Sequence, residues 1–377
     1  MQSSGGQMAG AIVQEWISVS GGSERVVSAM AESLGDVDIY TLWNDDPDRF
    51  RNYHVYESML RRRPFRGHKA LSIPLQLGLW RRLRPRRAYD WMLVSSHLFA
   101  HHARFIGEYR DIAKYVYAHT PARYIWEPSL DARGSKILPR VASSVLRPLD
   151  RMRAQEDHAL AANSEFVRQR IQSTWHRDAV VIPPPVDVER ISEVRDWTTM
   201  LSAGESRTYA SLPDEFILGA SRFIPYKRLD LVIKTAAVAD IPAVIAGDGP
   251  ELEHLTAMAR SAQVPVQIVR APSDALLYAL YQAAKVFVFP PVEDFGIMPI
   301  EALAAGCPVV TGPVGGASES LASVGLSGVA ASLEPQDLAQ QIDIASRGPR
   351  WMNSKAAQRF SKGKFVDALR TWMSIRH

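Results

Sequence analysis

Residues 286–311 read VFVFPPVEDFGIMPIEALAAGCPVVT and contain one complete strand–helix–strand unit. The unit opens with a short apolar run that suits a strand buried on both faces, and a proline pair ends this strand. Pro299 stands where the first turn of a helix tolerates proline, and the helix expected over about 298–305 ends at Gly306. Residues 309–311 then return as a strand. This order predicts a parallel sheet that is covered by helices.

The same alternation extends outward from this unit. Upstream of it, the predicted strands are 216–222, 243–246 and 266–269, and the predicted helices are 229–239 and 274–284. The first half of the chain is less even, with a helix that follows Gly21-Gly22 and runs to Leu34. The strands expected there are 11–16, 38–42, 91–95, 115–118, 159–163 and 180–182. We therefore expect an α/β protein built from two Rossmann-like domains.

The chain has 377 residues, which is enough for two domains of ordinary size. We place their boundary in the polar stretch 190–213, so that residues 1–195 form an N-terminal domain and residues 196–362 form a C-terminal domain. The helix expected within 363–377 is predicted to rejoin the N-terminal domain.

Composition and cysteine content narrow the class of protein. Hydrophobic residues make up 46% and charged residues 22%, as in globular proteins that fold in water. No uninterrupted apolar run reaches the roughly 18 residues of a membrane span, and residues 1–10 lack the pattern of a signal peptide. Cys307 is the only cysteine, which excludes an internal disulfide framework and a cysteine-cluster metal site. These features predict a cytoplasmic protein.

Positive charge is concentrated in residues 51–90. This region holds ten arginines and one lysine against two acidic residues, a local charge of +9 in a chain whose net charge is only +4. The arginines flank the apolar stretch 70–80. One interpretation is peripheral contact with an anionic membrane surface, at the inner face of the cell membrane. The other is a solvated charged face around an ordinary core helix.

Two features of the apolar stretch bear on this choice. Its apolar residues alternate with period 2, and Pro74 interrupts them, so the pattern does not favour a clean amphipathic helix. The basic region also lacks the interleaved aromatic residues of nucleic-acid-binding modules, and we expect no nucleic-acid partner.

Two glutamates frame the loop and helix of the 286–311 unit. Glu293 lies in the loop, and Glu301 lies in the first turns of the helix, eight positions later. The N–H groups of Gly296, Ile297 and Met298 stand at the positive end of the helix, where an anion binds. One carboxylate can then accept hydrogen bonds from sugar hydroxyls and the other from a ribose. The spacing alone also fits a solvated glutamate followed by a capping glutamate.

Two cations follow the strand at 216–222. Arg222 and Lys227 lie on a strand-end loop, which is where ligands bind in an open α/β sheet. Together they can neutralise a diphosphate, although two surface cations near a turn would have the same pattern.

The N-terminal half offers two further candidate loops. Gly21-Gly22, with Glu24 close behind, would let a ligand approach the backbone at a helix N-terminus, or would simply serve packing. This glycine pair is neither the dinucleotide fingerprint nor a phosphate-binding P-loop. The second loop, 117–127, reads YAHTPARYIWE and combines His119 with an arginine and several aromatic rings. Such rings can stack on sugars, whereas a lone histidine is more often structural than catalytic.

Taken together, these segments resemble the retaining glycosyltransferases of family 4, which have the GT-B fold. The resemblance covers nearly the whole chain and is strongest over 216–319. Its carriers are the E-x7-E pair Glu293 and Glu301, the diphosphate-binding pair Arg222 and Lys227, and the loop Gly21-Gly22-x-Glu24. The segment His119–Trp126, together with Glu293–Gly296, is similar to a mannosyltransferase-like branch that acts in bacterial polysaccharide and glycolipid assembly.

The resemblance implies two Rossmann-like domains that face each other across a cleft. It implies transfer of a hexose, above all mannose from GDP-mannose, to a glycan or lipid-linked acceptor, without a metal ion or another cofactor. Asp294 stands where family members often have Gly or Glu, as it does in the mannosyltransferase-like branch, and this supports the GDP-mannose donor without establishing it.

The resemblance also assigns roles. Four residues are expected to be catalytic. His119 would lie near the donor sugar, and Glu293 would hold the sugar hydroxyls. Arg222 and Lys227 would bind the diphosphate. The expected donor-binding residues, which include the ribose ligand Glu301, are Gly21, Gly22, Arg222, Lys227, Phe295, Gly296, Ile297, Met298 and Glu301. The expected acceptor-side residues are Glu24, Arg123, Tyr124 and Trp126. The nucleotide base would lie near 270–272.

Three alternatives remain open at this stage. The donor could be a UDP-sugar instead of GDP-mannose. The fold could also serve a sugar-nucleotide epimerase, although the sequence offers no identifiable acid and base carboxylates for that reaction. Finally, the chain could bind a nucleotide sugar without catalysis.

Overall fold

The computed structural model describes residues 8–19, 21–67, 69–126 and 137–374. It divides the chain into two compact units, which are Met1–Pro185 with Gly363–His377, and Val186–Lys362. The sequence places the boundary ten residues later, at 195/196. The difference arises because Val186, Val188 and Ile191 are buried in the core of the second unit.

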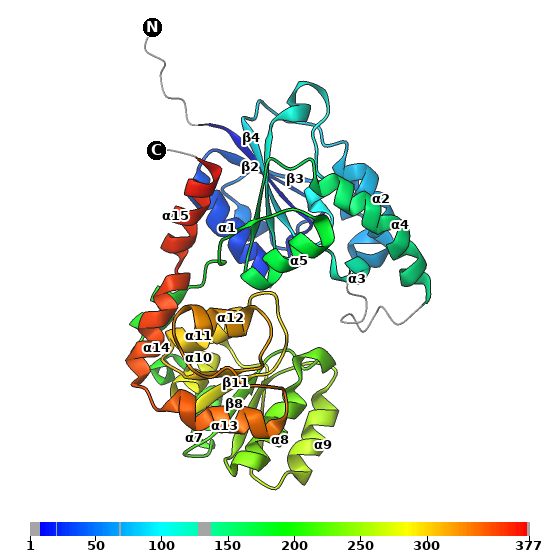
Figure 1. Ribbon diagram of the computed structural model, residues 1–377. Coiled ribbons are helices and arrows are strands. Elements are labelled where there is room, and N and C mark those ends of the chain that lie inside the picture. The colour runs from blue at the N-terminus through cyan, green and yellow to red at the C-terminus, as the bar shows by residue number, and fades with distance from the viewer. Residues whose placement is uncertain (1–7, 20, 68, 127–136, 375–377) are drawn as a thin grey trace. The chain divides into compact units, whose positions relative to one another are not determined.

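The first unit contains, in its described residues, a seven-stranded parallel sheet of order β3-β2-β1-β4-β5-β6-β7 (Figure 1). Its strands are β1 (Gly10–Gln14), β2 (Val37–Thr41), β3 (Val55–Glu57), β4 (Trp91–Ser96), β5 (Ala113–Ala118), β6 (Ala159–Ala162) and β7 (Val180–Val181). Its helices are α1 (Gly22–Leu34), α2 (Lys69–Trp80), α3 (Arg123–Trp126), α4 (Ile137–Ala154), α5 (Glu165–Trp175) and α15 (Lys362–Met373), the last of which begins one residue before the unit boundary.

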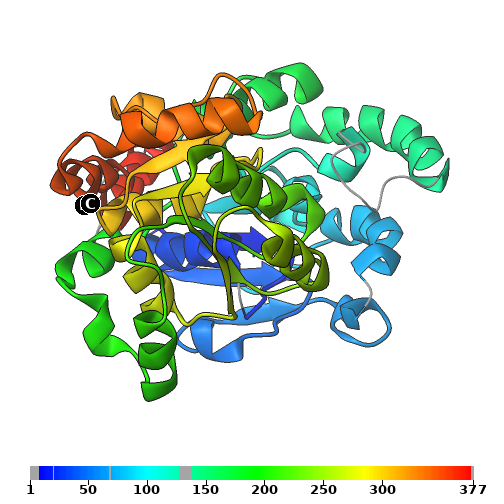
Figure 2. The same cartoon turned by 90° about the horizontal axis from the view of Figure 1, so that it is seen from below.

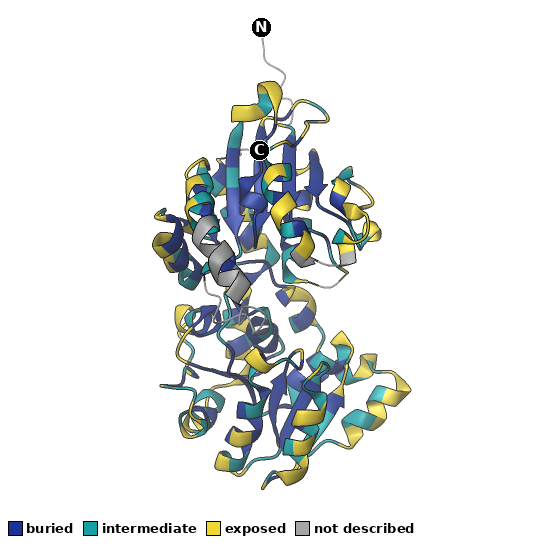
Figure 3. Cartoon of the chain, turned by 90° about the vertical axis from the view of Figure 1, so that its right-hand side faces the viewer, coloured by how far each residue is buried: buried dark blue, intermediate teal, exposed yellow. Residues whose placement is uncertain are grey.

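Alternate residues of each strand point to opposite faces of this sheet, so each face needs its own cover. Ile12 packs with side chains of α1 and α15, whereas Ala11 and Val13 pack with side chains of α2 and α5. The sheet is therefore covered on both faces, which is why its strands read as continuous apolar runs. Figure 3 shows these strands as buried and the helices as exposed on their outer sides.

The structure shows a helix in the apolar stretch of the basic region, as the core-helix interpretation expects. The alternating pattern and Pro74 do not favour a clean amphipathic helix, yet α2 is a helix with Pro74 inside it. Ile73, Leu77 and Trp80 are spaced so that they share one face, and they pack on the core of the first unit. This packing offsets the free-energy cost of the backbone hydrogen bond that the proline removes.

The second unit contains, in its described residues, a five-stranded parallel sheet of order β10-β9-β8-β11-β12 (Figures 1 and 2). Its strands are β8 (Ile217–Ala220), β9 (Ala243–Gly247), β10 (Val266–Arg270), β11 (Val286–Phe289) and β12 (Val309–Thr311). Its helices are α6 (Val188–Glu193), α7 (Ala203–Ala210), α8 (Leu229–Ala239), α9 (Leu252–Ser261), α10 (Asp274–Ala283), α11 (Ile297–Ala304), α12 (Gly316–Ser323), α13 (Pro335–Ser346) and α14 (Arg350–Ala357).

The predicted α/β class with two Rossmann-like domains is confirmed, since each unit is a parallel sheet between helices. Among the described residues, none of the helices is both long enough and apolar enough to span a bilayer.

Candidate functional site

The strand order of the second unit creates a topological switch point. The chain runs from β8 to β9 and β10 on one side, then returns to place β11 and β12 on the other side of β8. The loops that leave β8 and β11 therefore diverge at the carboxyl ends of these strands, which is the usual ligand site of such sheets. The four charged residues predicted to bind the donor follow these two strands.

The loop after β8 carries Arg222 and Lys227 and is fixed by its neighbour, the turn after β9. Phe223 donates its backbone N–H to the carbonyl of Asp248 at 2.8 Å. A Cβ atom at Gly247 would lie 1.8 Å from the Ser221 carbonyl, so only glycine permits this approach. Arg222 itself is exposed, and among the described residues it has no ion-pair partner.

The loop after β11 carries Glu293 and is held by a glycine pair that follows β12. Gly316 donates its N–H to the Glu293 carbonyl at 2.8 Å, and a Cβ atom at Gly316 would lie 2.3 Å from the Asp294 carbonyl oxygen. Gly296 precedes α11 with a φ of 85°, a left-handed conformation that favours glycine. The sequence does not single out Gly315-Gly316, although this pair after a strand was a readable signal.

Lys227 and Glu293 form an ion pair across the switch point, between Nζ and Oε1. Lys227 is nearly buried, with its ammonium 4.9 Å from the ring centre of Tyr226 and 5.9 Å from that of Phe289. The structure thus brings together two of the four predicted catalytic residues, one from each loop. Their charges neutralise each other.

The predicted donor-binding residues on and before α11 differ in what they offer. Phe295 is buried and packs against Phe360, with ring centres 5.8 Å apart, so only its backbone is available to a ligand. Ile297 and Met298 open the helix and are partly exposed. Glu301 is buried at 5% exposure, one turn further into the helix.

A hollow of about 440 Å³ lies beside the carboxyl end of β10. Arg270, Ala271 and Pro272 line it, which is the stretch where the sequence predicts the nucleotide base.

The first unit has its own switch point, between β1 and β4. Glu15 directly follows β1 and is completely buried. Its Oε1 accepts hydrogen bonds from Ser96 Oγ and from the N–H groups of His97, Leu98 and Ala100, at 2.8–3.1 Å. Its Oε2 lies 3.0 Å from His97 Nδ1. Burial alone raises the pKa of Glu15, but the imidazole of His97 and the N–H donors outweigh it and lower the pKa to about 2.

His119 follows β5 at the same edge of the sheet. Its Nε2 hydrogen-bonds with Ser95 Oγ at 2.8 Å, and its ring centre lies 6.4 Å from that of His97. Burial, followed by the neighbouring His97, lowers the pKa of His119 to about 3. The imidazole is therefore neutral near pH 7 and can bind substrate through hydrogen bonds, but not as a cation.

Glu15 and His97 lie beside the predicted site residue His119, and sequence reasoning did not select them. The predicted strand 11–16 extends through Glu15, whereas β1 ends at Gln14 and places Glu15 on the ligand-binding edge. The signal that could have identified it is a carboxylate immediately after an apolar strand.

The glycine loop before α1 is closed by its own glutamate. Glu24 accepts hydrogen bonds from the Ser18 N–H at 2.9 Å and from Ser23 Oγ at 3.0 Å, and it folds back over Gly21. Gly22 is the first residue of α1. The carboxylate of Glu24 thus holds the loop, and its predicted acceptor-side role remains a prediction.

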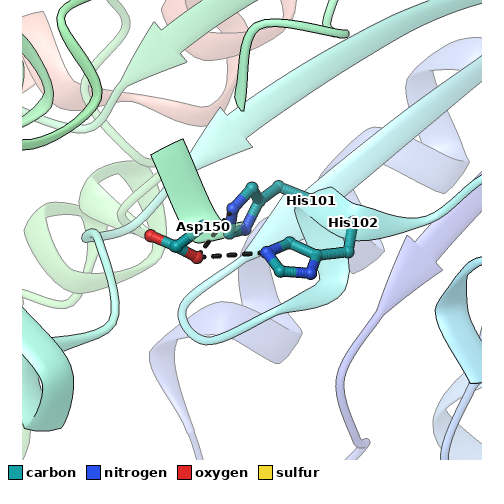
Figure 4. Close-up of side chains that lie close together, drawn as sticks. All are labelled: His101, His102 and Asp150. Atoms are coloured by element: carbon teal, nitrogen blue, oxygen red, sulfur yellow. Dashed lines mark hydrogen bonds and ion pairs between the residues drawn. The ribbon is translucent and has the colours of Figure 1, made fainter. Parts of the chain in front are cut away.

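Trp126 belongs to a separate buried cluster, shown in part in Figure 4. Trp126 and Trp175 donate their indole N–H groups to Asp150 Oδ2, each at 2.7 Å, while Nε2 of His101 and of His102 each lie 3.1 Å from Asp150 Oδ1. Burial is the main reason that the pKa of His102 falls to about 4.

The partners of Asp150 are those of a buried carboxylate held by hydrogen bonds, and not those of a metal ligand. Two of its four partners are indoles, which donate N–H groups and do not ligate metals, so the described donor set does not fit a metal ion well. The network joins α3, α4 and α5 to the short 3-10 helix Ala100–His102. The ring of Trp126 is also covered by Arg147 and Arg151, each 5.5 Å from its centre.

Of the other predicted acceptor-side residues, Arg123 opens α3 and is partly exposed. The side chain of Tyr124 lies outside the described part of the chain.

Comparisons with known proteins cover both units. The family model "Glycosyltransferase Family 4" matches residues 20–190, and "Glycosyl transferases group 1" matches residues 207–364. The chain is 32% identical over 176 residues to a GDP-mannose-dependent alpha-(1-6)-phosphatidylinositol monomannoside mannosyltransferase of Mycolicibacterium smegmatis, which covers 42% of this chain and 45% of the relative. It is 30% identical over 228 residues to a D-inositol 3-phosphate glycosyltransferase of Nocardiopsis dassonvillei, covering 55% of this chain and 51% of the relative. The chain thus spans about half the length of the curated relatives it matches.

Solved structures resemble the chain over nearly its whole length. Anabaena Alr3699/HepE in complex with UDP aligns with a TM-score of 0.70 at 17% identity, covering 97% of this chain and 100% of that one. WaaG, a glycosyltransferase involved in lipopolysaccharide biosynthesis, aligns with a TM-score of 0.61 at 16% identity, covering 95% of this chain and 99% of that one. At these identities the likeness concerns the fold.

Proposed function

Because the chain belongs to glycosyltransferase family 4 and has the GT-B fold, we propose that it is a retaining hexosyltransferase that moves mannose from GDP-mannose to a glycan or lipid-linked acceptor. The observation that carries this proposal is the Lys227–Glu293 pair at the switch point, beside the exposed Arg222. Lys227 can bind the diphosphate of a sugar nucleotide, and Glu293 can accept hydrogen bonds from the hydroxyls of its sugar.

The ion pair gives each partner a role when the donor arrives. The diphosphate replaces Glu293 as the counter-ion of Lys227, and Arg222 supplies a second cation. Glu293 is then released to accept hydrogen bonds from the sugar hydroxyls. Glu301 binds the ribose, and the N–H groups of Phe295, Gly296, Ile297 and Met298 face the donor. Gly21 and Gly22 remain predicted donor-binding residues.

In the transfer step, the bond between the anomeric carbon and the diphosphate oxygen breaks, and its electron pair stays on the diphosphate. The acceptor oxygen bonds to the anomeric carbon on the same face, and its proton passes to the departing phosphate. Arg222 and Lys227 stabilise the charge that develops on the leaving group, which is the main catalytic contribution. His119 lies near the donor sugar as a neutral hydrogen-bonding group. The reaction needs no metal ion.

A thermal-shift screen without added metal tests the donor. The ligands are GDP-mannose, GDP, UDP-glucose, UDP-GlcNAc and UDP, and a ligand at 100 times its Kd stabilises a fold by about 2.7 kcal/mol. We expect selective stabilisation by GDP-mannose and GDP. Stabilisation by the UDP ligands would instead indicate a UDP-sugar as the donor. The structurally similar Anabaena protein was solved in complex with UDP.

The same screen separates the alternatives. If no nucleotide stabilises the protein, the transferase proposal is overturned. If a nucleotide sugar binds and its sugar changes configuration without an acceptor, the epimerase reaction is favoured over transfer.

We further propose that the basic region 51–90 touches an anionic membrane surface where lipid-linked acceptors reside. Arg82, Arg84 and Arg86 line a hollow of about 390 Å³, and among the described residues none of the three forms an ion pair. Leu71 and Leu75, on α2, are 54% and 46% exposed. This arrangement suits a protein that is cytoplasmic and peripheral to the inner face of the membrane.

Vesicle sedimentation tests this contact. We expect binding to vesicles of phosphatidylcholine mixed with phosphatidylglycerol, reduced binding when Arg82, Arg84 and Arg86 are changed to alanine, and little binding to phosphatidylcholine alone. Equal binding to both kinds of vesicle would remove the proposal.

A further inference from the structure

A hollow of about 390 Å³ lies at the carboxyl edge of the first sheet. Its lining includes Thr41, the last residue of β2, and Glu57, the last residue of β3. Three exposed arginines of one short segment border it, namely Arg82, Arg84 and Arg86. Ligands of open α/β sheets bind outside the carboxyl ends of the strands, so the hollow has the position of a binding site.

The five arginines of residues 81–87 divide into two groups. Arg81 pairs with Glu156, and Arg87 pairs with Asp36 and Asp38. The other three are those that border the hollow, and among the described residues they form no ion pair. The protein therefore neutralises the arginines that lie away from the hollow and leaves the charges beside it uncompensated.

The acidic residue of the lining does not supply the missing counter-ion. Glu57 accepts a hydrogen bond from the backbone N–H of Asn44 at 2.8 Å, and its other oxygen lies 3.7 Å from the guanidinium of Arg61. Its partners thus lie outside the basic segment 81–87. An anion that enters the hollow would meet three cations whose charge no carboxylate of the lining offsets.

The segment that carries these cations is held by its backbone. Leu83 donates its N–H to the carbonyl of Arg104 at 3.2 Å and accepts a hydrogen bond from the N–H of Ile106 at 2.9 Å. The N–H of Arg86 donates to the hydroxyl of Tyr40 at 3.1 Å, and Tyr40 is buried. Because this backbone is already ordered, an anion that binds here has less conformational entropy to remove.

The hollow also has an apolar part. The guanidinium of Arg86 lies 5.2 Å from the ring centre of Tyr56, which lines the hollow. Met59, which is 77% exposed, and the partly exposed Leu79 line it as well. Guanidinium groups bind phosphate oxygens through a planar fork, and apolar side chains suit hydrocarbon. The lining therefore fits a phosphate that is joined to a carbon chain.

We propose that this hollow binds a phosphate ester. The three unpaired guanidinium groups hold the phosphate oxygens, and Met59 and Leu79 contact the carbon chain. The apolar part favours the headgroup of a membrane phospholipid over a soluble sugar phosphate, which has the same phosphate chemistry. The proposal rests on the membrane contact proposed above and deepens it, from attraction to a charged surface to a saturable site for one headgroup.

Isothermal titration with water-soluble probes tests the site. Dihexanoylphosphatidylglycerol, kept below its micelle concentration, should bind saturably with one molecule per chain. Glycerol 3-phosphate lacks the acyl chains and should bind roughly tenfold more weakly, the effect of one or two buried methylene groups. Dihexanoylphosphatidylcholine should also bind at least roughly tenfold more weakly, because it brings a choline cation beside the arginines.

Each comparison has a decisive outcome. Equal binding of the two lipids would overturn the proposal, since the acyl chains alone would then account for affinity. Binding of glycerol 3-phosphate as tight as that of the anionic lipid would support the phosphate-ester site and assign it to a soluble ligand. No saturable binding of any probe would overturn the site.

Variants with matched charge separate a built site from diffuse attraction. Alanine at all three arginines of the hollow should weaken binding of the soluble anionic lipid at least roughly tenfold. The control changes Arg51, Arg62 and Arg63 to alanine, which removes the same charge from exposed positions of the basic region outside the hollow. It should keep the wild-type affinity, and an equal loss in both variants would overturn the site.

A third variant keeps the charge and removes the planar fork. Lysine at all three arginines of the hollow should retain binding to anionic vesicles but weaken binding of the soluble lipid. All three variants should unfold at the wild-type temperature, because every changed side chain is exposed. Wild-type affinity of the lysine variant for the soluble lipid would overturn the role given to the guanidinium groups.

The site and the membrane contact can fail separately, and neither readout requires sugar transfer. Saturable binding of the soluble lipid without binding to vesicles would retain the site and remove the membrane contact. Vesicle binding that both alanine variants reduce equally, without saturable binding of the soluble lipid, would retain the contact and overturn the site.

Discussion

Charged side chains at the carboxyl edges of the two sheets are neutralised in two different ways. In the second unit the partner is another side chain, which a ligand can replace, and in the first unit the partners include backbone N–H groups, which a ligand leaves in place. Lys227 and Glu293 neutralise each other, and removal of Glu293 takes this counter-ion from the nearly buried ammonium of Lys227. Glu15 is different, because backbone N–H groups satisfy it and no ligand is needed to hold it ionised. The pair in the second unit is thus suited to exchange, and the carboxylate in the first unit is suited to a fixed position.

Glu301 gives a prediction about donor affinity. Glu301→Ala should weaken binding of the donor nucleotide roughly tenfold or more, since a hydrogen bond to a charged group contributes about 1.5–3 kcal/mol. Isothermal titration with GDP and with GDP-mannose measures this change. The exposed Glu253 on α9 provides the control Glu253→Ala, which should bind like the wild type. Equal affinities for Glu301→Ala and the wild type would remove the ribose assignment.

Two histidines with lowered pKa values give a prediction about acid stability. The pKa of His102 is about 4 and that of His119 about 3 in the folded protein, below the ordinary value of 6.5. Below pH 6.5 these histidines bind protons in the unfolded chain but stay neutral in the folded chain. Their contribution to the free energy of unfolding is therefore fully present above pH 6.5 and is lost as the pH falls. His102 alone should account for about 3 kcal/mol at pH 4.

Urea denaturation at pH 7, 5.5 and 4 measures this loss. His102→Gln should flatten the dependence of the unfolding free energy on pH, whereas His54→Gln, at an exposed position, should leave its slope unchanged. Identical slopes in all three proteins would contradict the assignment.

At the scale of elements, the loops of the candidate site are shaped by glycines on neighbouring loops. Gly316→Ala should displace the Glu293 loop, because the new Cβ would lie 2.3 Å from the Asp294 carbonyl oxygen and 2.5 Å from Phe295 Cα. We expect a loss of donor binding together with lower stability, measured by titration and thermal unfolding. Gly348→Ala is the control, since nothing lies within 4 Å of a Cβ atom there. Wild-type donor affinity in Gly316→Ala would show that this brace is dispensable.

The sequence predicts the elements better than it predicts their contacts. The 286–311 unit appears in the structure as β11, α11 and β12 almost to the residue, because short apolar strands and proline and glycine boundaries are local signals. The pattern of α2 did not favour a clean amphipathic helix, because the stability of this helix comes from packing on the core and not from its pattern. Likewise, Lys227 and Glu293 lie 66 positions apart, and only the strand order brings β8 beside β11.

At the scale of the whole chain, the first unit is built from two separate segments. Its helix α15 buries Phe365, Leu369 and Met373 in the core beside β1 and α1. Leu369→Ala should therefore destabilise the first unit by about 2–5 kcal/mol, the usual cost of such a cavity. Hydrogen exchange followed by mass spectrometry should show faster exchange in peptides of the first unit and unchanged exchange in those of the second.

The matched control is Asp367→Ala, which alters an exposed side chain of the same helix. It should leave the exchange of both units as in the wild type. Faster exchange in the second unit of Leu369→Ala would show that the two units do not unfold independently.

The position of α15 in the sequence has a consequence for biosynthesis. The ribosome makes all of Val186–Lys362 before it makes the rest of α15, and at roughly 5–20 residues per second this takes on the order of ten seconds or more. During that interval, the apolar side chains that later meet Phe365 and Leu369 have no cover. The second unit, which is continuous in sequence, can complete its fold first. Nascent chains of this protein therefore expose an apolar surface, to which chaperones can bind, for a limited time. This surface is covered only after α15 emerges from the ribosome.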